Sequence, residues 1–147
     1  MNSTFVSLDG VQNHMEHWHF DLINAELADL ALEQLRAADA MLMGRATYES
    51  YAAVWPERAG DYADTINAMP KYVASTTLET PGWMNTSVID GDLVEAVRGL
   101  KEQDGRDILM HCAVVCRTQR HRVTPAECAP LAIARTGRSG RRATMLG

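Results

Sequence analysis

Residues 39–50 read Asp-Ala-Met-Leu-Met-Gly-Arg-Ala-Thr-Tyr-Glu-Ser, and this stretch decides the fold class. Residues 40–43 form an apolar run without a polar interruption, which is typical of a strand buried on both faces. Gly44 ends the run, and a helix is predicted to follow it. The first turn of such a helix points unpaired N–H groups and the positive end of its dipole beyond the strand. Arg45 and Thr47 add positive charge and a hydroxyl, so the stretch predicts an anion site. An ordinary strand-to-helix turn with a solvated arginine is the alternative.

Strand and helix patterns alternate on both sides of this stretch, which predicts a layered α/β sheet. Strands are predicted over residues 4–8, 40–43, 71–77 and 86–89, with one more beginning over 107–111. Helices are predicted over 45–53, over 61–68, along 93–101, and from a cap at Asp21 or Asn24 with the apolar positions Ile23, Leu27, Leu30, Ala31 and Leu35. No internal repeat is visible.

The length of 147 residues fits one domain with a sizeable core. The N-terminus has no basic region of the kind that opens a signal peptide. No apolar segment approaches the roughly 20 residues of a membrane span. We therefore expect a soluble, cytoplasmic protein.

The charge and the aromatic residues are distributed unevenly along the chain. The residues up to Met110 carry 7 Lys+Arg and 18 Asp+Glu, a net charge of −11, and the rest carry 7 Arg and 1 acid, a net charge of +6. All nine aromatic residues lie at or before Trp83, whereas all three cysteines lie in the last 37 residues. Residues 116–147 show no amphipathic element of normal length, and we predict that residues 112–147 form a poorly ordered, Arg- and Cys-rich tail.

Four segments, in this order, resemble the dihydrofolate-reductase-like family. The closer resemblance is to its stand-alone bacterial members, which are related to the C-terminal reductase domain of the bifunctional riboflavin-biosynthesis deaminase/reductase. It covers about residues 1–111, which would form an incomplete domain. The segments are Val6-Ser-Leu-Asp-Gly-Val11, Met43-Gly-Arg-Ala-Thr-Tyr-Glu49, Met69-Pro-Lys-Tyr-Val-Ala-Ser-Thr-Thr-Leu78 and Val88-Ile-Asp-Gly-Asp-Leu93.

The resemblance implies a three-layer α/β/α sandwich that binds NADPH at the carboxyl ends of its strands. It also implies hydride transfer to a small heterocyclic substrate, pterin- or pyrimidine-like, in a protein that commonly forms a homodimer. By position, the residues that would contact the cofactor phosphates are Gly44, Arg45 and Thr47, and those near the adenosine ribose and its 2′-phosphate are Ser75, Thr76 and Thr77. A basic residue at this second place would favour NADPH over NADH. Thr76 offers only a hydroxyl, so the nucleotide preference stays open.

The resemblance also places acidic residues near the substrate. Asp9 falls in the loop that borders the nicotinamide, and Asp21 and Glu26 lie at the mouth of the next helix. A buried carboxylate there could donate or relay a proton while the nicotinamide delivers hydride. The alternatives are a turn former before Gly10 for Asp9 and a helix cap for Asp21. The ring-bearing residues that would line the substrate pocket, or else cover the edge of the core, are Trp18, His19 and Phe20.

The chain departs from the family after residue 111. The family has a glycine-rich turn there, whereas this chain has Cys112-Ala-Val-Val-Cys116, and the later helix and strands have no match. A wrong reading frame of GC-rich DNA is our hypothesis for this tail. The native-length gene, read in its other frames past codon 111, should then restore glycine and strand patterns, and two frames without them would refute it. A truncated reductase fold that cannot hold the cofactor, and therefore no enzyme, is the alternative function.

The residues after 110 raise two other classes of function, a zinc site and nucleic-acid binding. The potential zinc ligands His111, Cys112, Cys116, His121 and Cys128 follow a C-x3-C-x4-H-x6-C spacing, which matches no strong zinc pattern, so we predict no metal site. The arginine-rich tail could contact nucleic-acid phosphates. However, the acidic body and the absence of a reader motif argue against nucleic acid as a partner.

Overall fold

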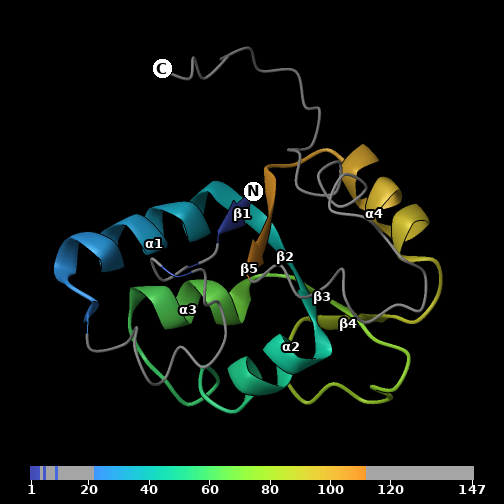
Figure 1. Ribbon diagram of the computed structural model, residues 1–147, viewed down its shortest axis with the longest axis horizontal. Helices are drawn as coiled ribbons and strands as arrows, with labels where there is room; N and C mark the ends of the chain where they lie inside the picture. The colour runs from blue at the N-terminus through green and yellow to red at the C-terminus, as the bar shows by residue number, and fades with distance from the viewer. Residues whose placement is uncertain (4, 6–8, 10–21, 112–147) are drawn as a thin grey trace.

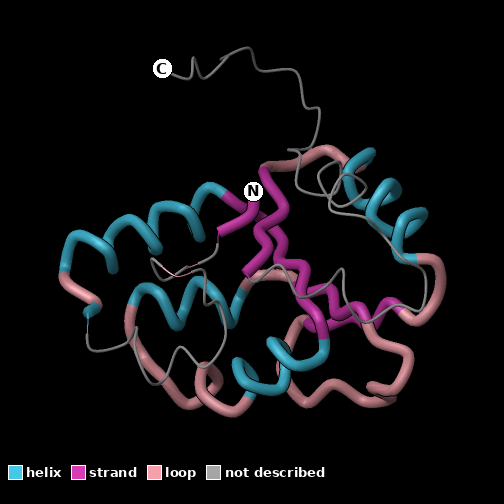
Figure 2. The backbone as a smooth tube through the Cα atoms, in the orientation of Figure 1, coloured by secondary structure: helices cyan, strands magenta, loops and turns pink. Residues whose placement is uncertain are grey.

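The computed structural model describes residues 1–3, 5, 9 and 22–111, and the structural statements below concern these residues. Five parallel strands form one sheet in the order β1-β5-β2-β3-β4 (Figures 1 and 2). The strands are β1 (Asn2–Ser3), β2 (Ala38–Gly44), β3 (Lys71–Ala74), β4 (Thr86–Ile89) and β5 (Asp107–His111). The helices are α1 (Ala25–Ala37), α2 (Arg45–Ala52), α3 (Asp61–Ala68) and α4 (Leu93–Glu102).

Strand β2 is the centre of the sheet and is buried on both faces, as its uninterrupted apolar run predicts. It pairs with β5 on one side and with β3 on the other. Met41 and Met43 belong to the hydrophobic cluster on one face, and Ala40 and Leu42 belong to the cluster on the opposite face. Alternation of side chains along a strand therefore lets one short segment serve two cores.

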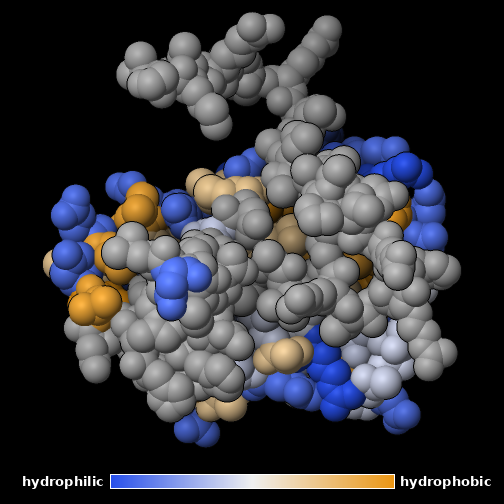
Figure 3. All heavy atoms as spheres, viewed as in Figure 1, coloured by the Kyte–Doolittle hydropathy of each residue, from blue (hydrophilic) through white to orange (hydrophobic). Residues whose placement is uncertain are grey.

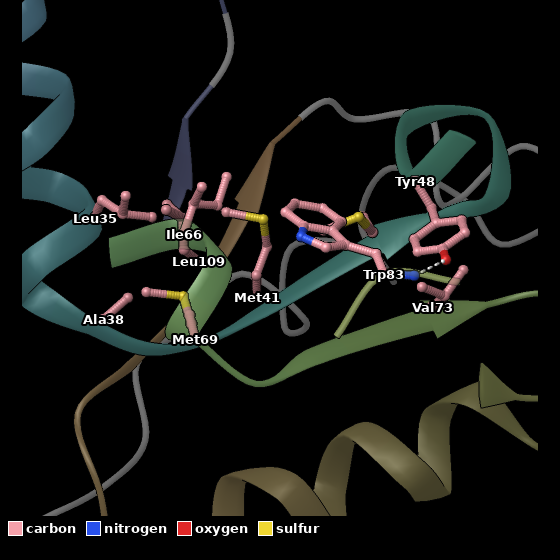
Figure 4. Close-up of a cluster of buried hydrophobic side chains, with 10 residues drawn as sticks. Leu35, Ala38, Met41, Tyr48, Ile66, Met69, Val73, Trp83 and Leu109 are labelled. Atoms are coloured by element: carbon pink, nitrogen blue, oxygen red, sulfur yellow. Dashed lines mark hydrogen bonds between the residues drawn. The ribbon is translucent and has the colours of Figure 1, made fainter. Parts of the chain in front are cut away.

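The first core lies between the sheet and the layer formed by α1, α2 and α3, which occupy one side in Figure 1. Figure 4 shows Met41 beside Trp83, with Leu35 and Ile66 on one side of this pair and Tyr48 on the other. Burial of such large apolar side chains stabilises the fold by about 1.5–3 kcal/mol each.

The second core lies under α4 on the opposite face. Leu93, Val97 and Leu100 repeat at helical spacing and are buried against the sheet. The helix begins where the Asp92 carboxylate accepts hydrogen bonds from the backbone N–H groups of Val94 (2.8 Å) and Glu95 (3.1 Å). The two helical layers confirm the predicted three-layer α/β/α sandwich.

Several elements differ from the sequence-based expectations. The first strand among the described residues is Asn2–Ser3, and the strand predicted over residues 4–8 stays a prediction, because residues 4 and 6–8 lie outside the described part of the chain. Strand β3 ends at Ala74, three residues earlier than predicted. The predicted apolar stripe of α1 was partly wrong, because Ile23 precedes the helix and Leu30 is 49% exposed. Figure 3 shows hydrophobic side chains at the surface over the N-terminal part of α1, at the left of the view. No helix in the described part of the chain has the length and hydropathy of a membrane span.

Candidate functional site

The carboxyl ends of parallel strands meet at one edge of the sheet, and the turn from β2 into α2 lies on this edge. Gly44 is the N-cap of α2 in an extended conformation, and no side chain caps the first turn. Among the described residues no side-chain cap of this turn is seen, so its N–H groups can bind an anion. Arg45 is exposed in the first turn and Thr47 is half-buried there, so both residues of the predicted phosphate site accompany Gly44.

The side chain of Arg45 joins this turn to the neighbouring strand end. Its Nη1 donates a hydrogen bond to the hydroxyl of Thr77 and a longer one to the Thr77 carbonyl oxygen (3.4 Å). Its Nε donates to the Glu49 carboxylate (2.6 Å), one turn along α2. The guanidinium therefore lies beside Thr77, one of the residues that the resemblance leads us to expect near an adenosine 2′-phosphate, although the arginine belongs to a different strand end.

The loop after β3 is shaped by Ser75. The Ser75 hydroxyl accepts hydrogen bonds from the N–H groups of Thr77 (3.2 Å) and Leu78 (3.0 Å), which turns the chain away from the sheet. Strand β3 ends just before this turn, although the Ser75 N–H still donates to the Ile89 carbonyl oxygen at the end of β4 (3.1 Å). Ser75 itself is buried, whereas Thr76 and Thr77 are exposed, so the two threonines are the ones accessible to a ligand.

The far end of the same loop is anchored in the core. The Tyr48 hydroxyl accepts a hydrogen bond from the buried N–H of Trp83 (3.1 Å; Figure 4), and the Trp83 indole donates to Oδ1 of Asn67 (2.7 Å). Tyr48 lies three residues after Arg45 on α2. Helix α2 therefore holds this loop at two places, through Arg45 near its start and through Tyr48 near its end.

The buried side chain of Lys71 contacts the same end of this loop, beside Trp83. The Lys71 side chain has 0% exposure, and its ammonium donates to the carbonyl oxygens of Asn67 (3.0 Å), Met69 (2.7 Å) and Met84 (3.2 Å). It also lies 4.3 Å from the centre of the Trp83 ring. Burial lowers the pKa of Lys71 to about 8, so the group is still mainly protonated at neutral pH. The carbonyl oxygens and the ring favour that charged form.

The predicted acidic residues are not brought together in the described part of the chain. Asp9 is exposed in a turn. Glu26 is exposed in the first turn of α1, in an open depression that Asp29, Leu30 and Glu33 also line. Asn24, whose amide oxygen accepts from the Leu27 N–H (2.8 Å), is the cap of α1. The remaining predicted site residues Trp18, His19, Phe20 and Asp21 lie outside the described residues.

A second polar pair at this edge was missed by the sequence analysis. The Tyr51 hydroxyl, on α2, lies 3.0 Å from Nδ1 of His111, the last residue of β5, and the two rings pack edge to face. Burial lowers the pKa of His111 to about 4, so its ring is neutral at pH 7. By its place in the sequence, His111 was only a potential zinc ligand. Among the described residues there is no group of three or more potential metal ligands.

The comparisons with known proteins agree with this architecture. The model of the RibD C-terminal domain family matches residues 1–115, which is most of the chain. The chain belongs to the RibD C-terminal domain family. Comparison with curated protein sequences finds no match.

A solved structure supports the fold of this RibD C-terminal domain. It is a crystal structure of a Shewanella sp. PV-4 protein that carries a provisional assignment to riboflavin biosynthesis, and it superposes with a TM-score of 0.53 at 24% identity. The match covers 75% of this chain and 62% of the Shewanella chain. The RibD C-terminal domain described here therefore spans about three fifths of that neighbour's length.

Proposed function

We propose that this RibD C-terminal domain is an NADPH-dependent reductase of a small heterocyclic substrate, pterin- or pyrimidine-like. The single observation that carries the proposal is the Arg45–Thr77 contact. It places a guanidinium between the uncapped first turn of α2 and the exposed loop after β3. A nucleotide with several phosphates, one of them on its ribose, is the ligand chemistry that fits two neighbouring anion-binding features.

The residues at this edge fit the cofactor in distinct roles. Backbone N–H groups at Gly44 and the first turn of α2 would bind the bridging phosphates, with the Thr47 hydroxyl beside them. Arg45 would bind the 2′-phosphate, and the hydroxyls of Thr76 and Thr77 would accompany it. The basic group that is missing next to Thr76 in the sequence is thus supplied by α2, which favours NADPH over NADH. When bound, the cofactor would supply the hydride.

Asp9 and Asp21 remain the proposed proton-handling residues, and Trp18, Phe20 and Glu26 the proposed substrate contacts. A homodimer also remains a proposal. A fold that binds no cofactor is the second candidate, and the absence of glycine from residues 112–116, where the family has a glycine-rich turn, favours it.

Hydride transfer can be followed directly. The full chain would be incubated with NADPH carrying deuterium at both positions of nicotinamide C4, together with dihydrofolate, whose N5=C6 imine accepts a hydride at carbon and a proton at nitrogen. Transfer of one deuteride to carbon of the probe, seen by mass spectrometry as one deuterium in the reduced product, supports the reductase. Binding of NADPH without transfer to dihydrofolate would reject this pterin as the substrate. Failure to bind NADPH would favour the non-catalytic candidate.

A further inference from the structure

The Tyr51–His111 pair has no role in the anion site described above. His111 is half-buried at the carboxyl end of β5, on the same face as Leu109, two residues earlier. Tyr51 reaches it from the last turn of α2. On the other side, Ser3 is the register partner of His111 and donates a hydrogen bond to Oε1 of Gln34 on α1 (2.8 Å). The pair therefore lies between α1 and α2 at the edge where the cofactor is proposed to bind.

The sheet order places this pair and the Arg45–Thr77 contact on opposite sides of strand β2. Strand β2 lies between β5, which carries His111, and β3, which leads to Thr77. Three neighbouring strands span about 10 Å at ordinary spacing. Leu42 pairs with Met110, so His111 is level with Met43, one residue before the start of the anion site at Gly44. A dinucleotide lying across these strand ends, with its bridging phosphates at Gly44 and its 2′-phosphate at Arg45, would extend its other half toward β5.

The chemistry of the pair suits an uncharged ring. The Tyr51 hydroxyl is hydrogen-bonded to Nδ1 of His111, which fixes the orientation of the imidazole. The second ring nitrogen, Nε2, has no hydrogen-bond partner among the described residues. Because burial keeps the ring neutral, Nε2 offers either one donor or one acceptor rather than a positive charge. Tyr51 is the group from α2 whose hydroxyl contacts the ring.

An aromatic row continues from the pair toward α3. Tyr51 packs edge to face with Trp55 at 6.3 Å between ring centres, and Trp55 packs on Tyr62 at 4.8 Å. Tyr62 and Trp55 are partly buried against the first core. These contacts restrict the rotamers of Tyr51 and, through its hydroxyl, the orientation of the His111 ring.

We propose that His111, oriented by Tyr51, hydrogen-bonds the edge of the planar heterocyclic substrate beside the nicotinamide end of the bound cofactor. The inference rests on the proposed function and deepens it by naming a substrate-binding residue. His111 binds the substrate directly through Nε2, and Tyr51 is a positioning residue. A ring carbonyl or ring nitrogen is the substrate group that a neutral imidazole recognises.

The test compares binding of two ligands to the full chain. NADP⁺ is titrated first, and dihydrofolate or 2,5,6-triaminopyrimidin-4-one is titrated next at saturating NADP⁺, so that no turnover occurs. The variants are His111→Phe, which keeps a flat ring, and Tyr51→Phe, which keeps the edge-to-face contact. Tyr62→Phe is the matched control, because it removes a tyrosine hydroxyl elsewhere in the same aromatic row.

We expect His111→Phe to weaken binding of the probe about tenfold or more, the usual effect of losing a hydrogen bond to a buried polar group. Tyr51→Phe should weaken it severalfold, and Tyr62→Phe should leave it unchanged. NADP⁺ affinity should change less than twofold in all three variants. Wild-type affinity for the probe in His111→Phe would overturn the inference and leave the proposed cofactor site standing.

Two further outcomes separate the inference from the proposed function. Wild-type protein that binds NADP⁺ but neither probe would overturn the inference alone, and protein that binds no NADP⁺ would overturn both. If His111→Phe does not fold, nitrogen-detected NMR of the wild-type imidazoles replaces it. The histidine that is still neutral at pH 5 should shift on addition of the probe, and an unchanged resonance would overturn the inference.

Discussion

Arg45 and Thr77 are 32 residues apart in the chain, yet the Arg45 guanidinium donates to both the hydroxyl and the carbonyl oxygen of Thr77. Parallel pairing of β2 with β3 brings the two strand ends side by side. The contact places the positive charge of the Arg45 guanidinium beside the loop after β3. Both residues are exposed, so the contact contributes little to stability and is available to a ligand.

Replacing this arginine should change the nucleotide preference. We expect Arg45→Gln to weaken NADPH binding about tenfold or more, because a charge-assisted hydrogen bond contributes about 1.5–3 kcal/mol. NADH, which lacks the 2′-phosphate, should lose much less affinity. Calorimetric titration of both nucleotides measures the difference. Arg98→Gln is the control, since Arg98 is also an exposed helical arginine with a carboxylate partner, Glu95, at 2.7 Å. Equal losses for the two nucleotides would contradict the assignment.

The Tyr48–Trp83 hydrogen bond should contribute measurably to stability. Tyr48→Phe removes the acceptor of a buried backbone N–H, which costs about 1–3 kcal/mol. The urea midpoint should fall accordingly, with an unchanged slope. Tyr72→Phe is the matched control, because Tyr72 is partly buried against the second core and its hydroxyl makes no hydrogen bond within the described part of the chain. Equal midpoints for the two variants would refute the role of the Tyr48 hydroxyl.

Lys71 should make stability depend on alkaline pH. Its pKa is lowered by burial from the ordinary 10.5 to about 8, so between these values the unfolded chain binds more protons than the folded one. Stability should therefore rise with pH across this window. In Lys71→Met this contribution should vanish, and the fold should be less stable at pH 7 because three carbonyl oxygens lose their donor. Denaturant titrations of wild type and Lys71→Met from pH 7 to 10 would measure both effects. If the unfolding free energies of the two proteins changed with pH in parallel, the predicted titration of Lys71 would be disproved.

His111 should produce a corresponding dependence at acidic pH. Burial lowers its pKa from 6.5 to about 4, so the unfolded chain binds the extra proton first as the pH falls. The stability present above pH 6.5 should be lost progressively down to pH 4. The difference in unfolding free energy between wild type and His111→Phe isolates this contribution, because the carboxylates are common to both proteins. A difference that does not change with pH would show that the ring titrates normally.

The fold could be predicted largely from local patterns. The apolar run before Gly44 marks the central strand, and α3 and β4 have the boundaries that the sequence predicts. Where prediction failed, a longer-range or side-chain effect decided. The Ser75 hydroxyl accepts hydrogen bonds from two N–H groups ahead of it, and β3 ends at this turn. Leu30 has helical spacing but is exposed, because periodicity does not reveal how far a neighbouring element extends.

The candidate site was predicted in part. Gly44, Arg45 and Thr47 are adjacent in sequence, so a strand-to-helix turn was enough to group them. The reach of Arg45 to Thr77 depends on strand order, which no local pattern encodes. Tyr51 and His111 are 60 residues apart and joined by tertiary contact alone, so sequence reasoning had no signal for the pair.

The most direct test of the central claim is a thermal-shift titration of the full chain with NADPH, with NADH in parallel. A ligand that binds only the folded state increases the free energy of unfolding by mass action, by about 2.7 kcal/mol at a hundredfold excess over the dissociation constant. The melting temperature rises accordingly. We predict a saturable rise with NADPH at concentrations where NADH gives little. Cooperative melting at the same temperature with and without either nucleotide would contradict the cofactor site around Arg45.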